Sequence, residues 1–169
     1  IPALVANPLE VVFGGGRPID GGIKIGGKRI LGDGKTWRGL FGGGLSGGFI
    51  GLTLYLGLSS VLNFYPSFFE AVIIVFSFSF GALLGDIFGS LIKRRLGKKR
   101  GEMVLGIDQY DFFVGAFFVS LITESHWLID TYFEGDGWIT ILILIIGVPL
   151  LHRVINIIGY KIGLKKEPW

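Results

Sequence analysis

The sequence lacks cysteine altogether, has only two histidines and is poor in charged residues. Without cysteine, disulfides and thiolate-ligated metals are excluded, and two histidines argue against a histidine-rich metal site. Only 17% of the 169 residues are charged while 50% are hydrophobic, which is more apolar than a water-soluble domain of this length requires. The 29 glycines follow no collagen-like period, and glycine inside apolar runs is typical of closely packed membrane helices.

Five apolar stretches predict an all-α integral membrane protein with five transmembrane helices in a single polytopic domain, residues 1–169. The predicted spans are residues 1–13, 39–62, 71–92, 110–129 and 138–160. Residues 39–62 carry no charge and are long enough, as a helix, to cross a bilayer. Residues 1–13 are shorter than a full span, so we expect them to be the end of a first transmembrane helix. Loops 14–38 and 93–109 lie between spans, the first with a short hairpin expected around Ile23–Ile30.

Every lysine and arginine falls on one side of this predicted topology. Loop 14–38 holds six, loop 93–109 holds six and the C-terminal end holds four, whereas the opposite ends carry five acids and no cation. The positive-inside rule then predicts a multi-pass cell-membrane protein with its N-terminus outside and its C-terminus and both loops on the cytoplasmic side. Aromatic residues mark the expected outer interface: Tyr65, Trp127, Tyr132 and Trp138.

Three aspartates lie where the spans meet the second basic loop. Asp86 interrupts the apolar stretch seven residues before Lys93, and Asp108 and Asp111 are three apart, which places both on one helical face. A charged side chain at the centre of a membrane helix costs roughly 2.5–3.5 kcal/mol, so an acid in a span indicates a function. Carboxylates combined with substrate phosphates are the ligands that Mg²⁺ prefers, and these aspartates are therefore the predicted metal ligands.

Structural explanations for the same aspartates stay open. Asp108 fits a helix N-cap, and Asp111 fits an acid in a first helical turn, where the helix dipole favours negative charge. Asp86 could serve only as an ion-pair partner of Arg94 or Arg95. The sequence alone does not decide between these alternatives and a metal site.

Two further segments are candidates for binding phosphate groups. Ser90, Lys93 and Arg94 follow Asp86 at the spacings of one helical face, and Arg95 is adjacent. The remaining cations of that loop are expected to set the topology and to contact lipid headgroups: Lys98, Lys99 and Arg100.

The second segment is LGDGKTWRG, residues 31–39. Its glycines free backbone N–H groups, and the polar side chains beside them suit an anion near a helix N-terminus: Asp33, Lys35, Thr36 and Arg38. A nucleotide-binding P-loop is excluded because Arg29 stands where that motif requires glycine. Asn7, within the first apolar stretch, is either an interhelical hydrogen-bond partner or a substrate-binding residue.

The motifs together resemble those of the CDP-diacylglycerol synthase family. Ser90-Leu91-Ile92-Lys93-Arg94 is similar to that family's Ser-x-x-Lys-Arg element, and Asp108-Gln109-Tyr110-Asp111 is similar to its Asp-Arg-x-Asp element. Gln109 replaces the family's arginine and the His-Gly-Gly element is missing, which indicates a divergent branch. GGGRPID and GGKRILGDGKTWRG resemble the archaeal branch, the CDP-archaeol synthases.

This resemblance implies a reaction between CTP and an unsaturated archaeal ether-lipid phosphate, 2,3-di-O-geranylgeranylglyceryl phosphate. The products are a CDP-lipid and pyrophosphate, the cofactor is one or two Mg²⁺ ions, and the implied catalytic residues are Asp86, Lys93, Asp108 and Asp111. Such a reaction needs alignment and charge neutralisation more than a strong base, because the lipid phosphate is already anionic. The expected partners are these substrates and membrane lipids but no nucleic acid, and a homodimer is left open.

Three other functions fit less well. CDP-alcohol phosphotransferases require a wider aspartate spacing than that of Asp108 and Asp111. A small transporter or channel with Asp86 as its cation site would more often place polar groups near the membrane midplane and contain internal repeats. A purely structural membrane subunit would have no use for Asp86 within a span.

Overall fold

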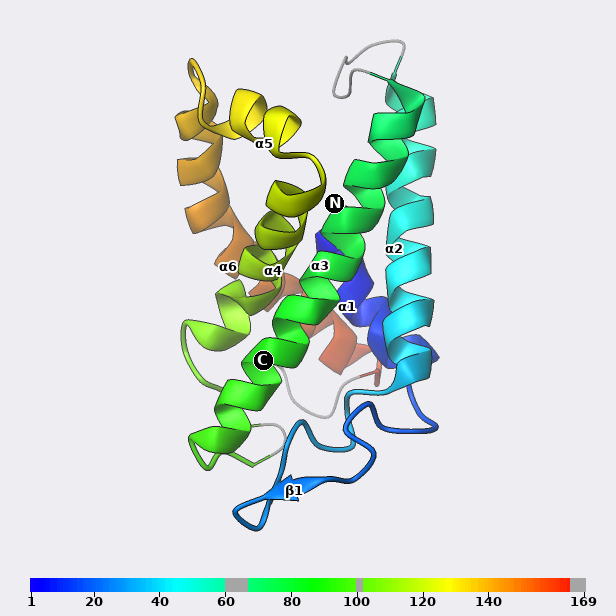
Figure 1. The fold of residues 1–169 in the computed structure, drawn as a ribbon, viewed down its shortest axis with the longest axis vertical. Helices are drawn as coiled ribbons and strands as arrows, with labels where there is room; N and C mark the ends of the chain where they lie inside the picture. The colour runs from blue at the N-terminus through cyan, green and yellow to red at the C-terminus, as the bar shows by residue number, and fades with distance from the viewer. Residues whose placement is uncertain (60–66, 100–101, 165–169) are drawn as a thin grey trace.

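The computed structural model describes residues 1–59, 67–99 and 102–164, and its regular elements are helices apart from one small hairpin (Figure 1). The helices are α1 (Pro2–Phe13), α2 (Trp37–Leu58), α3 (Phe68–Arg95), α4 (Ile107–Thr123), α5 (Ser125–Tyr132) and α6 (Gly137–Lys161), and the strands are β1 (Lys24–Ile25) and β2 (Lys28–Arg29). Several residues of the predicted topology lie outside the described ranges: Tyr65 of the outer interface, Arg100 of the second basic loop, and Lys165 and Lys166 among the four cations of the C-terminal end.

Three of the described helices are long and apolar enough to cross a membrane. They are α2, α3 and α6, with 22, 28 and 25 residues. Helix α1 is a shorter apolar helix of 12 residues, and α4 has 17. The prediction of a helical membrane protein is therefore confirmed, while the number of five crossings and their orientation stay predictions.

The fourth predicted span, residues 110–129, differs from the structure. Helix α4 ends at Thr123, Glu124 adopts an extended φ of −143°, and the short α5 starts a new direction across the end of the bundle (Figure 1). The polar sequence Glu124–His126 explains the break, because these side chains favour water over the continued apolar face of a span.

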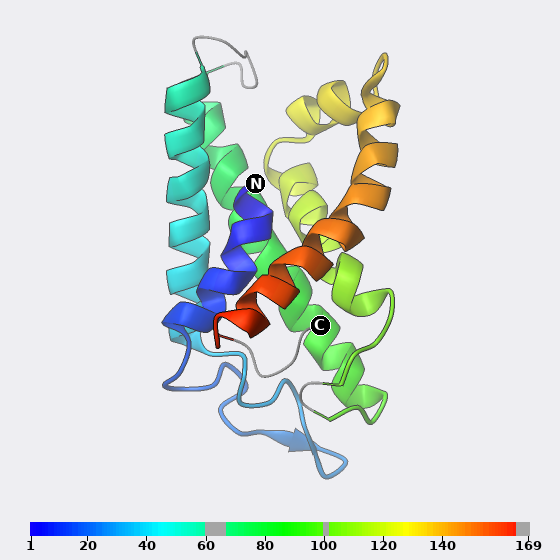
Figure 2. The same cartoon turned by 180° about the vertical axis from the view of Figure 1, so that it is seen from behind.

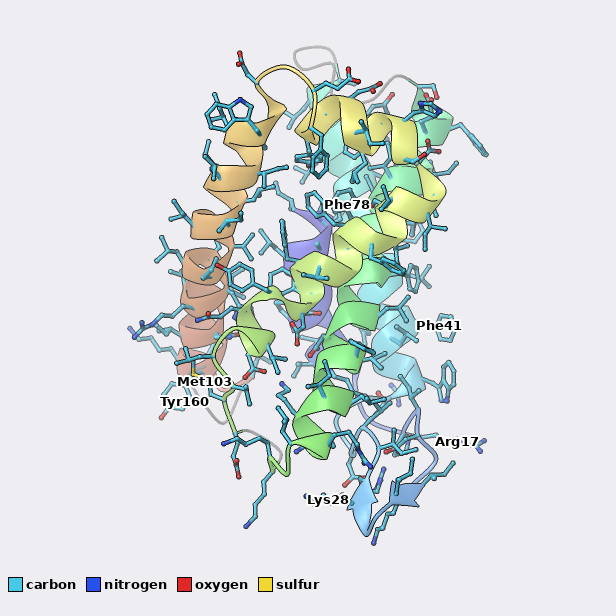
Figure 3. All side chains as sticks on the ribbon, turned by 60° about the vertical axis from the view of Figure 1, so that its left-hand side comes forward. Arg17, Lys28, Phe41, Phe78, Met103 and Tyr160 are labelled. Carbon is cyan, nitrogen blue, oxygen red and sulfur yellow. The ribbon has the colours of Figure 1, made fainter. Side chains whose placement is uncertain are left out.

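Glycines allow α2 to pack closely on two neighbouring helices. A Cβ atom at Gly43 would lie 2.7 Å from the Ala6 carbonyl oxygen of α1, and one at Gly44 would lie 2.3 Å from the Phe80 ring of α3. The four-residue glycine repeats thus mark two contact faces, as small residues do in membrane helices. On the outer side, Phe41 points away from the bundle and is 53% exposed, which suits a surface against lipid (Figure 3).

Helices α3 and α4 are also packed through glycine. A Cβ atom at Gly85 would lie 2.0 Å from the Asp111 carbonyl oxygen, and one at Gly89 would lie 2.2 Å from Asp111 Oδ2. Helix α6 stands further out, with Val148 and Asn156 as its buried residues, and its C-terminal half runs diagonally over the bundle toward the C-terminal end of α1 (Figure 2). The α3–α4 contact is what brings Asp111 into the interior of the bundle.

Candidate functional site at the charged end of the bundle

Asp20 holds the glycine-rich loop between α1 and α2 in one conformation. Its carboxylate accepts hydrogen bonds from the Arg29 guanidinium at 2.7 and 3.2 Å and from three backbone amides, those of Gly22, Leu31 and Gly32, at 3.0–3.1 Å. The Arg29 guanidinium and these amides favour the ionised form, so the pKa of Asp20 lies well below its usual range. The loop is therefore fixed around one buried negative charge.

We expect acid to loosen this loop. An aspartate whose pKa is lowered in the folded state stabilises the fold above its unfolded pKa of about 3.9, and that contribution is lost as the pH falls below it. Hydrogen exchange of the Leu31 and Gly32 amides should become faster in Asp20→Asn at neutral pH, relative to wild type. Asp33→Asn is the control, because Asp33 is exposed and bonds only the Arg29 side chain among described residues. Unchanged protection in Asp20→Asn would contradict the assigned role.

The end of the loop, just before α2, pairs through backbone hydrogen bonds with the segment at the start of the loop. The Ile19 amide donates to the Lys35 carbonyl oxygen at 2.9 Å, and the Trp37 amide donates to the Arg17 carbonyl oxygen at 3.2 Å. Thr36 then caps α2, since its hydroxyl oxygen accepts from the Gly39 amide at 3.1 Å. These contacts fix the backbone on both sides of Lys35 and direct its side chain into the bundle.

Lys35 joins the loop to two helices through buried ion pairs. Its ammonium lies 3.0 Å from Glu10 Oε2 of α1 and also contacts Asp86 Oδ2 of α3. Burial alone would lower the pKa of Lys35, but the Asp86 and Glu10 carboxylates outweigh it and hold that pKa above its usual value. The structural alternative for Asp86 is thus partly right, because the carboxylate is paired, but its partner here is Lys35.

A second lysine–aspartate pair lies between α3 and the start of α4. Lys93 contacts Asp108 Oδ1, and the Val104 amide donates to the other oxygen of the same carboxylate. Asp108 is not the N-cap of α4, because Gly106, with a φ of +87°, occupies that position. A glycine is required there by the left-handed backbone, and Asp108 lies in the first turn.

Asp111 has a buried oxygen without a hydrogen-bond partner in the described part of the chain. Its Oδ1 accepts from the Phe112 amide at 2.7 Å, whereas Oδ2 packs against Gly89 and remains unpaired there. The charges of Asp86 and Lys93 act on this carboxylate, so the three predicted metal ligands share one electrostatic neighbourhood. Unsatisfied buried oxygens are rare and costly, which indicates a missing partner.

The site contains more carboxyl groups than ammonium groups. The carboxyl groups are those of Glu10, Asp86, Asp108 and Asp111, and the ammonium groups of Lys35 and Lys93 pair with three of them. Within the described ranges, no three acidic or histidine side chains already have the spacing of a metal-binding group. The chemistry of the donor set nevertheless fits one divalent cation, because it offers carboxylate oxygens of which Asp111 Oδ2 is unpaired.

Arg94 and Arg95 connect the two basic loops. Arg94 Nε donates to the Leu31 carbonyl oxygen at 3.3 Å, and the Arg95 guanidinium donates to the carbonyl oxygens of Ile25 and Arg29 at 3.1 and 2.9 Å. Both arginines belong to the last turn of α3, where a positive charge interacts favourably with the helix dipole. In this structure they fix the hairpin under the helix, and their predicted contact with substrate stays a prediction.

The other predicted binding residues divide into buried and exposed ones. Ser90 is buried on α3, and Asn7 Oδ1 on α1 is buried without a hydrogen-bond partner among described residues. Asp33 and Arg38 are exposed at the loop surface. Their roles toward a substrate are not decided by these positions.

Several polar residues that the fold brings to this end were not predicted from the sequence. Glu10 and Asp20 were not among the candidates, although both are buried. On α6, Asn156 Nδ2 lies 3.3 Å from His152 Nδ1, and the His152 ring stacks on Phe112 with centroids 5.5 Å apart. A signal was available, because Glu10 and Asn156 are polar residues inside apolar stretches.

Comparisons with known proteins agree on one family. A family model described as CarS-like, CDP-archaeol synthase, matches residues 1–169. The chain is 45% identical to the CDP-archaeol synthase of Methanosarcina acetivorans, covering 100% of this chain and 99% of that protein. It is 43% identical to the CDP-archaeol synthase of Pyrococcus horikoshii, covering 100% of this chain and 92% of that one.

A solved structure has a similar fold. It is described as "Structural insight into an intramembrane enzyme for archaeal membrane lipids biosynthesis" and is 33% identical to this chain, with a TM-score of 0.62. The match covers 88% of this chain and 89% of that chain. The overall arrangement of the helices is therefore similar to that of a protein described as an intramembrane enzyme.

Proposed function

The chain belongs to the CDP-archaeol synthase family and is a cytidylyltransferase of archaeal membrane-lipid synthesis, and we propose that its reaction takes place at the charged end of the bundle. Asp86, Asp108 and Asp111 would bind Mg²⁺ there, and the two basic loops would bind the triphosphate of CTP. The acceptor is an ether-lipid phosphate such as 2,3-di-O-geranylgeranylglyceryl phosphate. A transporter with Asp86 as cation site is not favoured, because every relative reported above is a lipid-synthesis enzyme.

The observation that carries this proposal is Asp111 Oδ2, which is buried without a hydrogen-bond partner among the described residues. A buried carboxylate oxygen without a donor is destabilising by about 1–3 kcal/mol, and a divalent cation would compensate it. Four carboxyl groups share two ammonium groups here, and one Mg²⁺ would neutralise the difference when all four carboxyls are ionised. When bound, the metal would withdraw negative charge from the phosphates and hold them in position.

The residues of the chain would supply positioning and charge rather than a base. An oxygen of the lipid phosphate attacks the α-phosphorus of CTP, the bond to the β-phosphate breaks, and pyrophosphate leaves with the electron pair. Lys35 and Lys93 lie where they could neutralise the triphosphate, and Ser90 could orient it through its hydroxyl. No strong general base is required, because the attacking oxygen is already anionic.

The proposed membrane arrangement follows from charge. Helices α1, α2, α3, α4 and α6 would form five crossings, with α5 continuing α4 at the outer surface. With the cations of both loops and of the α6 end on the cytoplasmic side, the site faces the compartment that contains CTP. A lipid phosphate at headgroup depth would reach the same point, since Asp86 lies about two turns from the charged end of α3.

The direct test is synthesis in a defined system. Purified protein in detergent, supplied with Mg²⁺, radiolabelled CTP and the digeranylgeranylglyceryl phosphate, should form a labelled CDP-lipid and pyrophosphate in equal amounts. Omission of Mg²⁺ with EDTA present should stop the reaction. Formation of pyrophosphate without labelled lipid, or labelled lipid in EDTA, would contradict the proposed reaction centre.

A further inference from the structure

Lys35 is bound to a carboxylate that is also a proposed metal ligand. Its ammonium is bound to Asp86 Oδ2 and to Glu10 Oε2 together, and only 13% of its side chain is exposed. Asp86 is one of the proposed metal ligands, and in this structure its carboxylate binds an ammonium group. A lysine ammonium and a divalent cation on one carboxylate repel each other strongly at low dielectric.

The fold, rather than a chance rotamer, places Glu10 beside this lysine. A Cβ atom at Gly39 would lie 2.9 Å from Glu10 Cγ, so α2 packs directly on the Glu10 side chain. Glu10 is 4% exposed, and its Oε1 has no hydrogen-bond partner among the described residues. The glutamate therefore keeps an oxygen available for a second contact with an ammonium group.

We propose that Lys35 is an internal counter-ion that competes with the divalent cation for Asp86, and that Glu10 is the positioning residue that retains the lysine when the cation takes its place. This inference rests on the proposed metal site. In the free protein the lysine neutralises Asp86 and opposes binding of a bare cation. When the cation arrives, the ammonium moves fully onto Glu10 and stays near the loop, where the triphosphate is expected.

The proposal makes opposite predictions for the two members of the pair. Lys35→Met removes the competitor and should tighten binding of Mn²⁺, used as the probe, by roughly tenfold in the absence of nucleotide. Glu10→Gln leaves Asp86 as the only carboxylate on the lysine and should weaken Mn²⁺ binding by about threefold. Binding is measured by electron paramagnetic resonance of free Mn²⁺ with the whole chain in uncharged detergent. In the double variant the affinity should return toward that of Lys35→Met.

Lys24→Met is the matched control, because Lys24 is an exposed lysine of the hairpin and its removal changes the net charge equally. Its Mn²⁺ affinity should equal that of wild type. The proposed competition between Lys35 and the cation would be contradicted if Lys35→Met bound Mn²⁺ no more tightly than wild type. It would also be contradicted if Lys24→Met showed the same gain in affinity. Mn²⁺ binding that persists in Asp111→Asn would instead contradict the proposed metal site itself, so the two failures are distinguishable.

Discussion

Asp111→Asn should lose synthesis by roughly 10³-fold while the protein stays folded and is no less stable than wild type. The substitution keeps the shape of the side chain and the acceptor that bonds the Phe112 amide. It removes a negative charge whose Oδ2 is buried without a partner among described residues, and removal of such a charge does not cost stability. Loss of activity without loss of stability is the signature of a residue retained for function.

The measurement pairs the CDP-lipid assay with thermal unfolding in detergent. Asp130→Asn is the control, because Asp130 is an exposed aspartate of α5 at the opposite end of the bundle. That variant should keep both its activity and its unfolding temperature. Full activity in Asp111→Asn would remove the metal-site proposal, and a collapse of its stability would show that the carboxylate has a structural role instead.

The hairpin and the glycine faces were predictable because their causes are local. Gly26 and Gly27 follow a β-branched residue, and both adopt positive φ values of 59° and 78°, as the two central residues of a tight hairpin turn do. The glycine repeats of α2 likewise indicated a contact face without indicating the partner. Local sequence thus gave the position of the turn and the packing surface, and the partners came only from the tertiary structure.

Glu10 was not predicted because its role depends on a residue that is distant in the sequence. It lies in an apolar stretch, and its partner Lys35 is 25 residues away in a loop. The sequence spacing between Glu10 and Lys35 does not indicate that they are in contact. Their contact depends on the conformation of the intervening loop, which Asp20 fixes through the Leu31 and Gly32 amides. Asp20 itself was missed because an acid among glycines is ordinarily solvated, whereas here it is buried by the amides that it binds.

The three aspartates were predicted as site residues for a different reason. Asp86 interrupts an apolar stretch, and that interruption is visible without knowledge of the fold. The sequence did not indicate which lysine pairs with which aspartate, because basic residues are abundant at this end. In the structure Lys35 pairs with Asp86, and Lys93 pairs with Asp108. The choice among them depends on backbone hydrogen bonds, such as the one between the Ile19 amide and the Lys35 carbonyl oxygen.

Gly85→Ala should be the most destabilising single-methyl change in the α3–α4 contact. The added Cβ would lie 2.0 Å from the Asp111 carbonyl oxygen and 3.0 Å from Gly115 Cα, and both of these are backbone atoms that no rotamer change can move. The helices must separate, at a cost of about 3 kcal/mol, which corresponds to an unfolding temperature about 6–12 °C lower. Because Asp111 moves with α4, activity should fall as well, even well below the unfolding temperature.

Gly57→Ala supplies the control for helix propensity. Gly57 also lies within a membrane helix, α2, but a Cβ there would meet nothing within 4 Å. Alanine is favoured over glycine in a helix by about 1 kcal/mol, so this variant should be as stable as wild type or more stable. Equal stability of the two variants would mean that α3 and α4 are not packed backbone to backbone, and Asp111 would then not be fixed against Gly89 as the site requires.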